Sequence, residues 1–206
     1  MMNDRQSNDR LRTEDAAYAA RLAAEQSAWW KRWLDVQAPF RWNLRRLRPG
    51  FTLDVGCGMG RNLLHLGGNG VGVDHSPHMV EIARARGLRA FTPAEFQASA
   101  FDMVGRFDCL LLSHVVEHMT EPEAVGLLEA YLHTLKPGGQ VIAITPQEWG
   151  YGADPTHVEF MDFAALNRIA GAVKIKPIKQ FSFPFPRPFG RLFRWNEFVH
   201  VSLKAD

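Results

Sequence analysis

Two groups of residues in this sequence could do chemistry: a glycine-rich turn near residue 56, and histidines and glutamates between residues 114 and 159. The turn, Gly56-Cys57-Gly58-Met59-Gly60, follows an apolar run that contains Asp54. Its glycines let the backbone turn sharply and let a ligand approach where side chains would collide. Asp74 ends the next apolar run, where a carboxylate can accept both hydroxyls of a ribose. Together they predict a site for a nucleotide-like ligand.

The turn does not follow the dinucleotide pattern. The fingerprint G-x-G-x-x-G would need glycine at position 61, where this sequence has Arg61. The acidic Asp54 beside the turn suits an aminoacyl group better than a pyrophosphate. We therefore disfavour a dehydrogenase. A turn of this kind can also be purely structural, but the preceding strand and Asp74 favour a ligand.

The second group comes from two distant segments, Ser113-His114-Val115-Val116-Glu117-His118 and the loop around His157. Both should open at the carboxyl edge of a sheet, where ligands bind in open α/β folds. If residues 114–118 begin a helix, His114, Glu117 and His118 share one face. With His157 as a fourth ligand, they predict a divalent metal site. Alternatively, Glu117-His118 caps a helix and His157 is a general base.

The elements that position these residues read as an α/β fold. Short apolar runs alternate with candidate helices at residues 62–66, 77–86 and 121–135, which is the pattern of a parallel sheet. The runs are FTLDVG, GVGVD, LRAFT, FDCLLLS and GQVIAIT. Two later runs, around residues 173–183 and 198–203, could supply a final strand pair. The proline-rich FSFPFPRPFG cannot be regular helix and is expected to be a fixed loop.

The N-terminal part differs in character. Residues 1–12 are polar, and we expect a disordered tail. Residues 13–50 predict a helical lid: an amphipathic helix capped by Thr13, a tryptophan cluster, and a short helix over 40–47 that ends before Pro49-Gly50. Residues 51–206 would form the catalytic domain.

Composition limits the classes of protein. A chain of 206 residues, 46% of them apolar, is the size of one globular domain. No apolar run reaches the roughly 20 residues of a membrane helix, and no secretion signal opens the chain, so we expect a cytoplasmic protein. The net charge of +2 comes from basic ends and an acidic middle. Because the positive charges are dispersed, nucleic acid is disfavoured as a partner. The two cysteines, Cys57 and Cys109, are expected to be reduced packing residues.

The motifs LDVGCGMGRN, GVDHS, FDCLLLSHVVEHM and LKPGGQVIAITP, spread over residues 51 to about 162, resemble the class I S-adenosylmethionine-dependent methyltransferases. The resemblance implies a Rossmann-like, seven-stranded, mostly parallel sheet with helices on both faces. It also implies that the turn holds methionine, Asp74 the ribose and residues 94–96 the adenine. Thr92-Pro93 departs from the Gly-Asp common in the family, so a backbone carbonyl or Glu95 would have to meet the adenine amino group. The residues expected to contact the cofactor are Asp54, Gly56, Cys57, Gly58, Gly60, Arg61, Asp74, His75, Ala94, Glu95, Phe96 and Ser113.

The histidine group resembles the metal site of small-RNA 2′-O-methyltransferases and ubiquinone-pathway O-methyltransferases. Their Glu-x-x-Glu-His motif becomes His114-x-x-Glu117-His118 here. Imidazole is a softer ligand than magnesium usually prefers, so both magnesium and manganese stay open. A metal would lower the pKa of an acceptor hydroxyl, whereas a lone histidine would remove its proton directly. The catalytic candidates are His114, His118 and His157.

The acceptor side is expected to carry aromatic and amide walls. Gln37-Ala38-Pro39, ITPQEWGY, DPTHVEF, FPFPRPFG and WNEF resemble small actinobacterial sugar O-methyltransferases, among them the methylmannose polysaccharide O-methyltransferases. The resemblance implies a saccharide or a similar polar metabolite as acceptor, contacted by Trp30, Trp33, Gln147, Trp149 and Tyr151. The alternatives are a quinone-pathway or small-RNA methyltransferase, and a non-catalytic cofactor-binding module. The convergent ionisable residues argue against the module.

Overall fold

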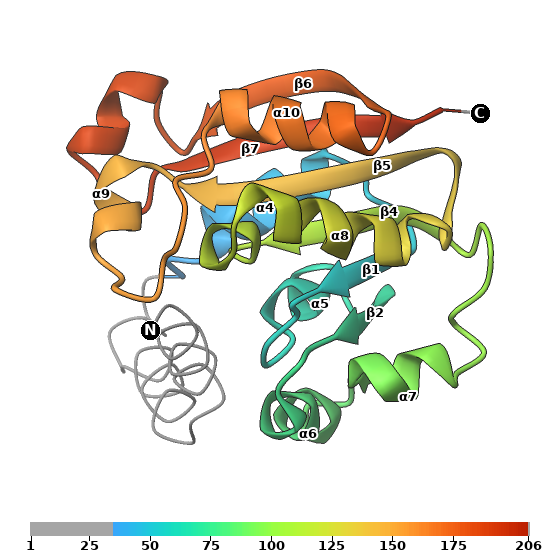
Figure 1. The fold of residues 1–206 in the computed structure, drawn as a ribbon. Helices are drawn as coiled ribbons and strands as arrows, with labels where there is room; N and C mark the ends of the chain where they lie inside the picture. The colour runs from blue at the N-terminus through green and yellow to red at the C-terminus, as the bar shows by residue number, and fades with distance from the viewer. Residues whose placement is uncertain (1–34, 206) are drawn as a thin grey trace, which may run out of the picture.

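A computed structural model describes residues 35–205, and its centre is a seven-stranded sheet (Figure 1). The strand order is β3-β2-β1-β4-β5-β7-β6. Strands β1 to β5 pair in parallel, whereas β7 is antiparallel to both of its neighbours. The strands are β1 Thr52–Val55, β2 Gly70–Val73, β3 Ala90–Phe91, β4 Phe107–Ser113, β5 Leu135–Pro146, β6 Ile175–Phe183 and β7 Glu197–Lys204. The predicted Rossmann-like, mostly parallel sheet is confirmed.

Helices cover both faces of this sheet. The helices are α4 Ala38–Arg46, α5 Arg61–His65, α6 Pro77–Ala85, α7 Pro93–Gln97, α8 Glu121–Leu132, α9 Glu148–Gly152 and α10 Phe163–Ala172, with short 3₁₀ turns η1 Val116–His118 and η2 Arg187–Arg191. Strand β4 shows how both faces are filled. Leu110 and Leu112 pack in the cluster that contains residues of α8 and α10, whereas Cys109 and Leu111 pack with Leu44 of α4. A strand buried on both faces reads as a continuous apolar run, which explains FDCLLLS.

The topology brings the functional segments to one edge. Strands β1, β2, β4 and β5 all end there, and the turns after them carry the residues that the sequence singled out. Because β7 runs antiparallel, it begins at this edge, with Glu197 opposite Pro146, the last residue of β5. Glu197, at the start of β7, therefore lies at the same edge as the residues that follow β1, β2, β4 and β5.

Several elements differ from the sequence-based expectations. Helix α7 was not predicted; it forms because Pro93 occupies its first turn and Thr92 and Glu95 make a reciprocal capping box. Helices α9 and α10 were not predicted either. Helix α8 ends at Leu132, and β5 already begins at Leu135, so the Lys-Pro-Gly-Gly segment lies within that strand.

Other expectations are met or fall outside the described residues. The proline-rich segment contains no α-helix: it includes the end of β6, a cis Phe183–Pro184 bond and most of η2. Helix α4 corresponds to the short helix predicted before Pro49. The expected tail, the helix from Thr13 and the tryptophan cluster lie outside the described residues, so the lid and its boundaries stay predictions. Among residues 35–205, no helix has the length and apolar character needed to cross a lipid bilayer.

Candidate active site

The glycine turn connects β1 to α5 and is held against β2. The amides of Gly56 and Cys57 both donate to the carbonyl of Val73, at 2.8 and 3.0 Å. Gly60 has φ +79°, and a Cβ there would lie 2.2 Å from Leu88 Cδ1. A larger residue at this position would meet backbone strain at positive φ and would require Leu88 to shift.

Asp74, at the end of β2, joins the two motifs of the cofactor side. Its Oδ2 accepts a hydrogen bond from the Gly58 amide at 2.7 Å, and its Oδ1 accepts one from the Ser76 amide at 2.9 Å. These bonds fix the carboxylate, which lines the cavity described below. Gly58 also lines it, and a Cβ at Gly58 would meet no atom within 4 Å. The turn therefore offers an open backbone cradle that fits a nucleoside-type cofactor.

Asp54 lies behind the turn rather than on the cavity wall. Its side chain is fully buried, and neither carboxylate oxygen has a hydrogen-bond partner. Burial raises the pKa of Asp54 to about 7, although the Asn62 side chain and the charge of Arg61 offset part of the rise. Asp54 therefore lies beneath the glycine turn in the interior of the protein and does not line the cavity.

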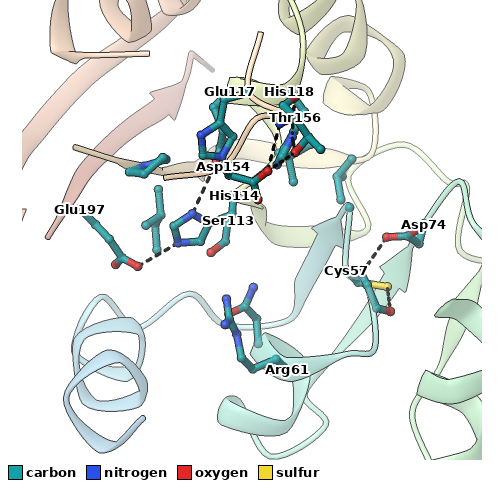
Figure 2. Close-up of a pocket in the computed structure, with 18 of the residues that line it drawn as sticks. Cys57, Arg61, Asp74, Ser113, His114, Glu117, His118, Asp154, Thr156 and Glu197 are labelled. Atoms are coloured by element: carbon teal, nitrogen blue, oxygen red, sulfur yellow. Dashed lines mark hydrogen bonds and ion pairs between the residues drawn. The ribbon is translucent and has the colours of Figure 1, made fainter. Parts of the chain in front are cut away.

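A cavity of about 1040 Å³ lies between two groups of polar residues, which we call the two poles of the site (Figure 2). The glycine turn and Asp74 lie on one side, and His114 and His118 lie across from them. The described residues expected at the cofactor that line this cavity are Gly56, Cys57, Gly58, Arg61, Asp74, His75 and Ser113.

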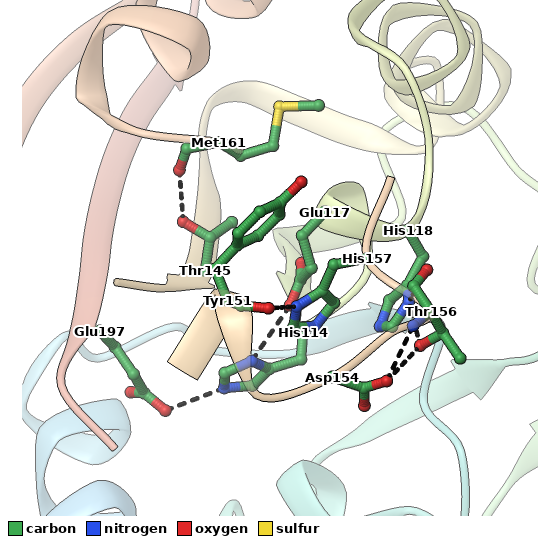
Figure 3. Close-up of polar contacts among 10 residues, drawn as sticks. All are labelled: His114, Glu117, His118, Thr145, Tyr151, Asp154, Thr156, His157, Met161 and Glu197. Carbon is green, nitrogen blue, oxygen red and sulfur yellow. Dashed lines mark hydrogen bonds and ion pairs between the residues drawn. The ribbon is translucent and has the colours of Figure 1, made fainter. Parts of the chain in front are cut away.

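The second pole forms because the loop before α10 is tied to η1. The amides of Val158 and Glu159 both donate to the Glu117 carbonyl, at 2.8 and 3.3 Å. This places a carboxylate oxygen of Glu117 and one nitrogen each of His118 and His157 within 4.8 Å of one another (Figure 3). The predicted meeting of the two segments at the carboxyl edge is therefore observed for these three residues.

Both of these histidines have a fixed tautomer. His118 Nδ1 lies 3.2 Å from the Thr156 carbonyl, and His157 Nδ1 lies 2.7 Å from the Tyr151 carbonyl. A carbonyl only accepts, so each Nδ1 carries the proton and each Nε2 keeps its lone pair. Burial, together with the neighbouring His157, lowers the pKa of His118, although Glu117 opposes the shift. Both rings can serve as ligands or as proton acceptors.

His114, the fourth residue of the expected set, lies outside this group of three. Its Nδ1 lies 3.2 Å from Glu117 Oε1 and its Nε2 lies 2.9 Å from Glu197 Oε1. Burial by itself would lower the pKa of His114, but the hydrogen bonds that its ring donates to the two carboxylates raise the pKa to about 10. The reason is the backbone: His114 has φ +59° and precedes η1, so it does not share a helix face with Glu117 and His118.

The remaining three residues fit a divalent cation. Glu117 Oε2 is buried and has no hydrogen-bond partner, and two imidazole lone pairs lie beside that carboxylate. A metal-binding histidine usually donates its second N–H to a carbonyl, as both histidines do here. Two imidazoles and one carboxylate suit manganese, iron or zinc better than magnesium.

Three residues expected at the adenine lie elsewhere. Ala94, Glu95 and Phe96 belong to α7 and are absent from the cavity wall, to which Pro93 contributes instead. Phe96 is 1% exposed and packs against Phe107 and Tyr131 in the core. Glu95 accepts a hydrogen bond from Arg84 at 2.8 Å and caps α7.

The expected acceptor residues do not form a wall. Gln147 is fully buried, and its amide bonds Ser182 Oγ, the Glu197 carbonyl and Asn196. Trp149 is 51% exposed and does not line the cavity. Tyr151 stacks on His157 with ring centroids 5.1 Å apart, behind the wall. Trp30 and Trp33 lie outside the described residues.

The structure adds wall residues to which the sequence analysis assigned no contact, although the WNEF motif contains Glu197. Phe40 and Asn43 come from α4, Leu127 and Tyr131 come from α8, and Glu197 comes from β7. The sequence signal for Glu197 was its place at the start of the last apolar run, which becomes informative only when that strand is known to be antiparallel. Elsewhere, His65 of α5 and His200 of β7 are buried, and both cysteines are buried as expected.

Comparison with known proteins agrees with this geometry. Residues 52–139 match the family described as a methyltransferase domain. A ubiquinone biosynthesis O-methyltransferase from Xanthomonas oryzae is 31% identical over 102 residues, which cover 46% of this chain and 42% of the relative. One from Xylella fastidiosa is 28% identical over 142 residues, which cover 61% of this chain and 57% of the relative. The matches thus span about half the length of these curated relatives.

Solved structures share the fold over nearly the whole chain. A methyltransferase from Haloferax volcanii, in complex with the Trm112 methyltransferase activator, superposes with a TM-score of 0.69 at 20% identity over 95% of this chain and 97% of its own. Magnesium protoporphyrin IX methyltransferase from Synechocystis, with bound S-adenosylhomocysteine, gives 0.65 at 13% identity over 94% and 97%. Residues 52–139, which contain the glycine turn and Asp74, thus resemble a methyltransferase domain, and the fold of the chain is the one that these solved methyltransferases share.

Proposed function

We propose that this protein is an O-methyltransferase that moves the methyl group of S-adenosylmethionine to a hydroxyl of a small molecule. One observation carries the proposal: the cofactor cradle at Gly58 and Asp74 faces Glu117, His118 and His157 across a single cavity. The cradle suits the cofactor, and the opposite pole suits a hydroxyl that must lose a proton. The curated relatives, named as O-methyltransferases, support transfer to oxygen.

Each residue of the site has a role in this proposal. Asp74 would accept the ribose hydroxyls, with His75 beside it, and the backbone of residues 56–60 would hold the methionine part. Arg61 and Ser113 would contact the cofactor from the two sides of the turn. S-Adenosylmethionine supplies an electrophilic methyl group, so the oxygen–carbon bond forms as the sulfur–carbon bond breaks. In the metal-free version of the site, His157 or His118 would accept the hydroxyl proton at Nε2, and positioning would provide most of the rate.

We further propose that Glu117, His118 and His157 bind a divalent cation, with manganese as the first ion to test. A bound cation would lower the pKa of the acceptor hydroxyl. The buried, unpartnered Glu117 Oε2 supports this, because an uncompensated buried carboxylate oxygen is costly. His114 is not a ligand in this version of the site.

For the acceptor, we propose a saccharide or a similar polar metabolite on the sequence resemblance to sugar O-methyltransferases. The competing class is an acceptor of the quinone pathway, which the curated relatives, named as ubiquinone biosynthesis O-methyltransferases, support. The described acceptor residues do not separate the two classes, since Gln147 is structural and Trp149 lies away from the cavity.

The test is transfer of labelled methyl to three panels: manno-oligosaccharides, catechol-type phenols and small RNA. We expect transfer to a hydroxyl of one panel and at least a hundredfold loss in His157→Ala. Exposed His78→Ala is the matched control and should retain full activity. Binding of S-adenosylhomocysteine without transfer to any panel would instead favour a non-catalytic module.

The metal is tested separately. We expect EDTA to abolish transfer and manganese to restore it. Unchanged turnover in EDTA would refute the cation while leaving the methyltransferase proposal intact, with His157 as the general base.

A further inference from the structure

Glu197 is the least expected residue of the site. It is the first residue of β7, its side chain is 12% exposed, and it lines the cavity. Its Oε1 lies 2.9 Å from His114 Nε2, and its backbone carbonyl accepts a hydrogen bond from the Gln147 amide at 3.0 Å. The backbone of Glu197 is thus held by the fully buried Gln147 side chain, and its carboxylate faces the His114 ring.

His114 connects two carboxylates. Its Nδ1 faces Glu117 Oε1 at 3.2 Å while its Nε2 faces Glu197, so each ring nitrogen has one carboxylate partner. The ring therefore bridges two carboxylates that come from different elements, Glu117 from η1 and Glu197 from β7. The backbone of His114 lies in the left-handed region, at φ +59°, which is strained for a residue other than glycine. Such a conformation persists where surrounding contacts require it.

The contact with His114 occupies only one of the two carboxylate oxygens of Glu117. Oε1 is held by His114, whereas Oε2 is buried and has no partner. The Glu117 side chain is fully buried, so water does not compete for it. Without the His114 ring between the two carboxylates, Glu117 would lose the one hydrogen bond that its side chain makes in the described part of the chain.

We propose that Glu197 is a positioning residue of this site: it holds the His114 ring, and that ring in turn fixes Glu117 beside His118 and His157. This inference rests on the proposed function. The first Glu of the related motif is thereby replaced by an ion-paired ring that a residue 83 positions later in the chain holds in place. In this proposal the site has three ligands, and His114 pairs with Glu197 instead of serving as a fourth ligand.

A double-mutant cycle tests the proposal with manganese as the probe. We expect Glu197→Gln to weaken Mn²⁺ binding about tenfold or more, as loss of a residue that orients a ligand usually does. In a His114→Gln background the same substitution should change binding less than twofold, because Glu197 acts through that ring. Equal losses in both backgrounds would overturn the proposal.

Matched controls separate positioning from folding. Glu148→Gln removes a carboxylate at the same edge, where Glu148 pairs with Arg187 away from the cavity, and should leave Mn²⁺ binding unchanged. Glu197→Gln should bind S-adenosylhomocysteine within twofold of the parent protein, which shows that the fold and the cofactor side are intact. Glu197→Asp should recover part of the loss.

A second measurement needs no metal. With ¹⁵N-labelled histidine rings, Glu197→Gln should shift the His114 signals and, through Glu117, those of His118. If the parent protein binds no Mn²⁺ but these shifts occur, the cation fails and the positioning role stands. If His114 is unaffected by Glu197→Gln, the positioning role fails whatever the metal does.

Discussion

We predict that the free energy of unfolding falls in acid because His200 is buried in its neutral form. It lies on β7, is 3% exposed, and is surrounded by apolar side chains of β4, α8 and α10. Its Nε2 donates to Asn167 Oδ1 at 3.1 Å. Burial, the sole cause of the shift, lowers the pKa of His200 from 6.5 to about 4.

The size of the effect follows from proton linkage. Between pH 6.5 and pH 4 the unfolded chain binds a proton at His200 that the folded protein excludes, so acid favours unfolding. The contribution is absent near neutral pH and grows as the pH falls toward 4. With these two pKa values, the free energy of unfolding drops by about 2 kcal/mol between pH 7.5 and pH 5.0.

The assay is urea unfolding of the parent protein and of His200→Gln at both pH values. Other groups also titrate: His65 has its pKa lowered to about 4, and Asp54 has its pKa raised to about 7. Only the difference between the two proteins isolates His200. In the variant, Asn167 Oδ1 keeps its hydrogen bond from Gln180. Exposed His78→Gln controls for the loss of a histidine.

We expect the drop in the free energy of unfolding to be about 2 kcal/mol smaller in His200→Gln than in the parent and in His78→Gln. Equal drops in all three proteins, within about 0.5 kcal/mol, would refute the reasoning, because His200 would then be as protonated folded as unfolded.

Three further predictions concern the turn and the corrected residues. Gly60→Ala should lower stability by about 1 kcal/mol more than Gly67→Ala in urea unfolding, because both have positive φ but only Gly60 meets a neighbour, Leu88; equal effects would show that Leu88 moves freely. Phe96→Leu should cost about 1–2 kcal/mol while calorimetry finds S-adenosylhomocysteine binding within twofold, since this ring packs in the core; a tenfold loss of affinity would restore its role at the adenine. Gln147→Ala should cost about 2 kcal/mol, because it leaves buried partners at Asn196 and Glu197 without their hydrogen bonds; unchanged stability would mean that the amide is free to meet an acceptor.

The sequence was sufficient for the parts of this protein that depend on local spacing. Alternating apolar runs and helices predicted the parallel sheet, and glycines at fixed intervals before Asp74 predicted the turn that meets β2. These features are local because a turn between a strand and a helix is specified by the residues within it. The meeting of Glu117, His118 and His157 followed from one topological rule about the carboxyl edge.

Expectations failed where local propensity or long-range contacts decided. Thr92, Pro93 and Glu95 form a helix start, so the segment expected at the adenine folded into α7 and turned Phe96 into the core. The sequence placed Gln147 at the acceptor, but its side chain is buried and hydrogen-bonds to Ser182 and Asn196, which lie 35 and 49 residues away in the chain. Such partners have no signature in the spacing of nearby residues.

By itself, then, the sequence determined the class of fold and the cofactor turn, because both are encoded in short segments. The tertiary structure alone decided what His114 does. The motif placed His114 among the ligands, but the antiparallel direction of β7 brings Glu197 to the same edge, and the ring pairs with that carboxylate. Strand direction depends on packing across the whole sheet, so no spacing within a motif could have indicated it.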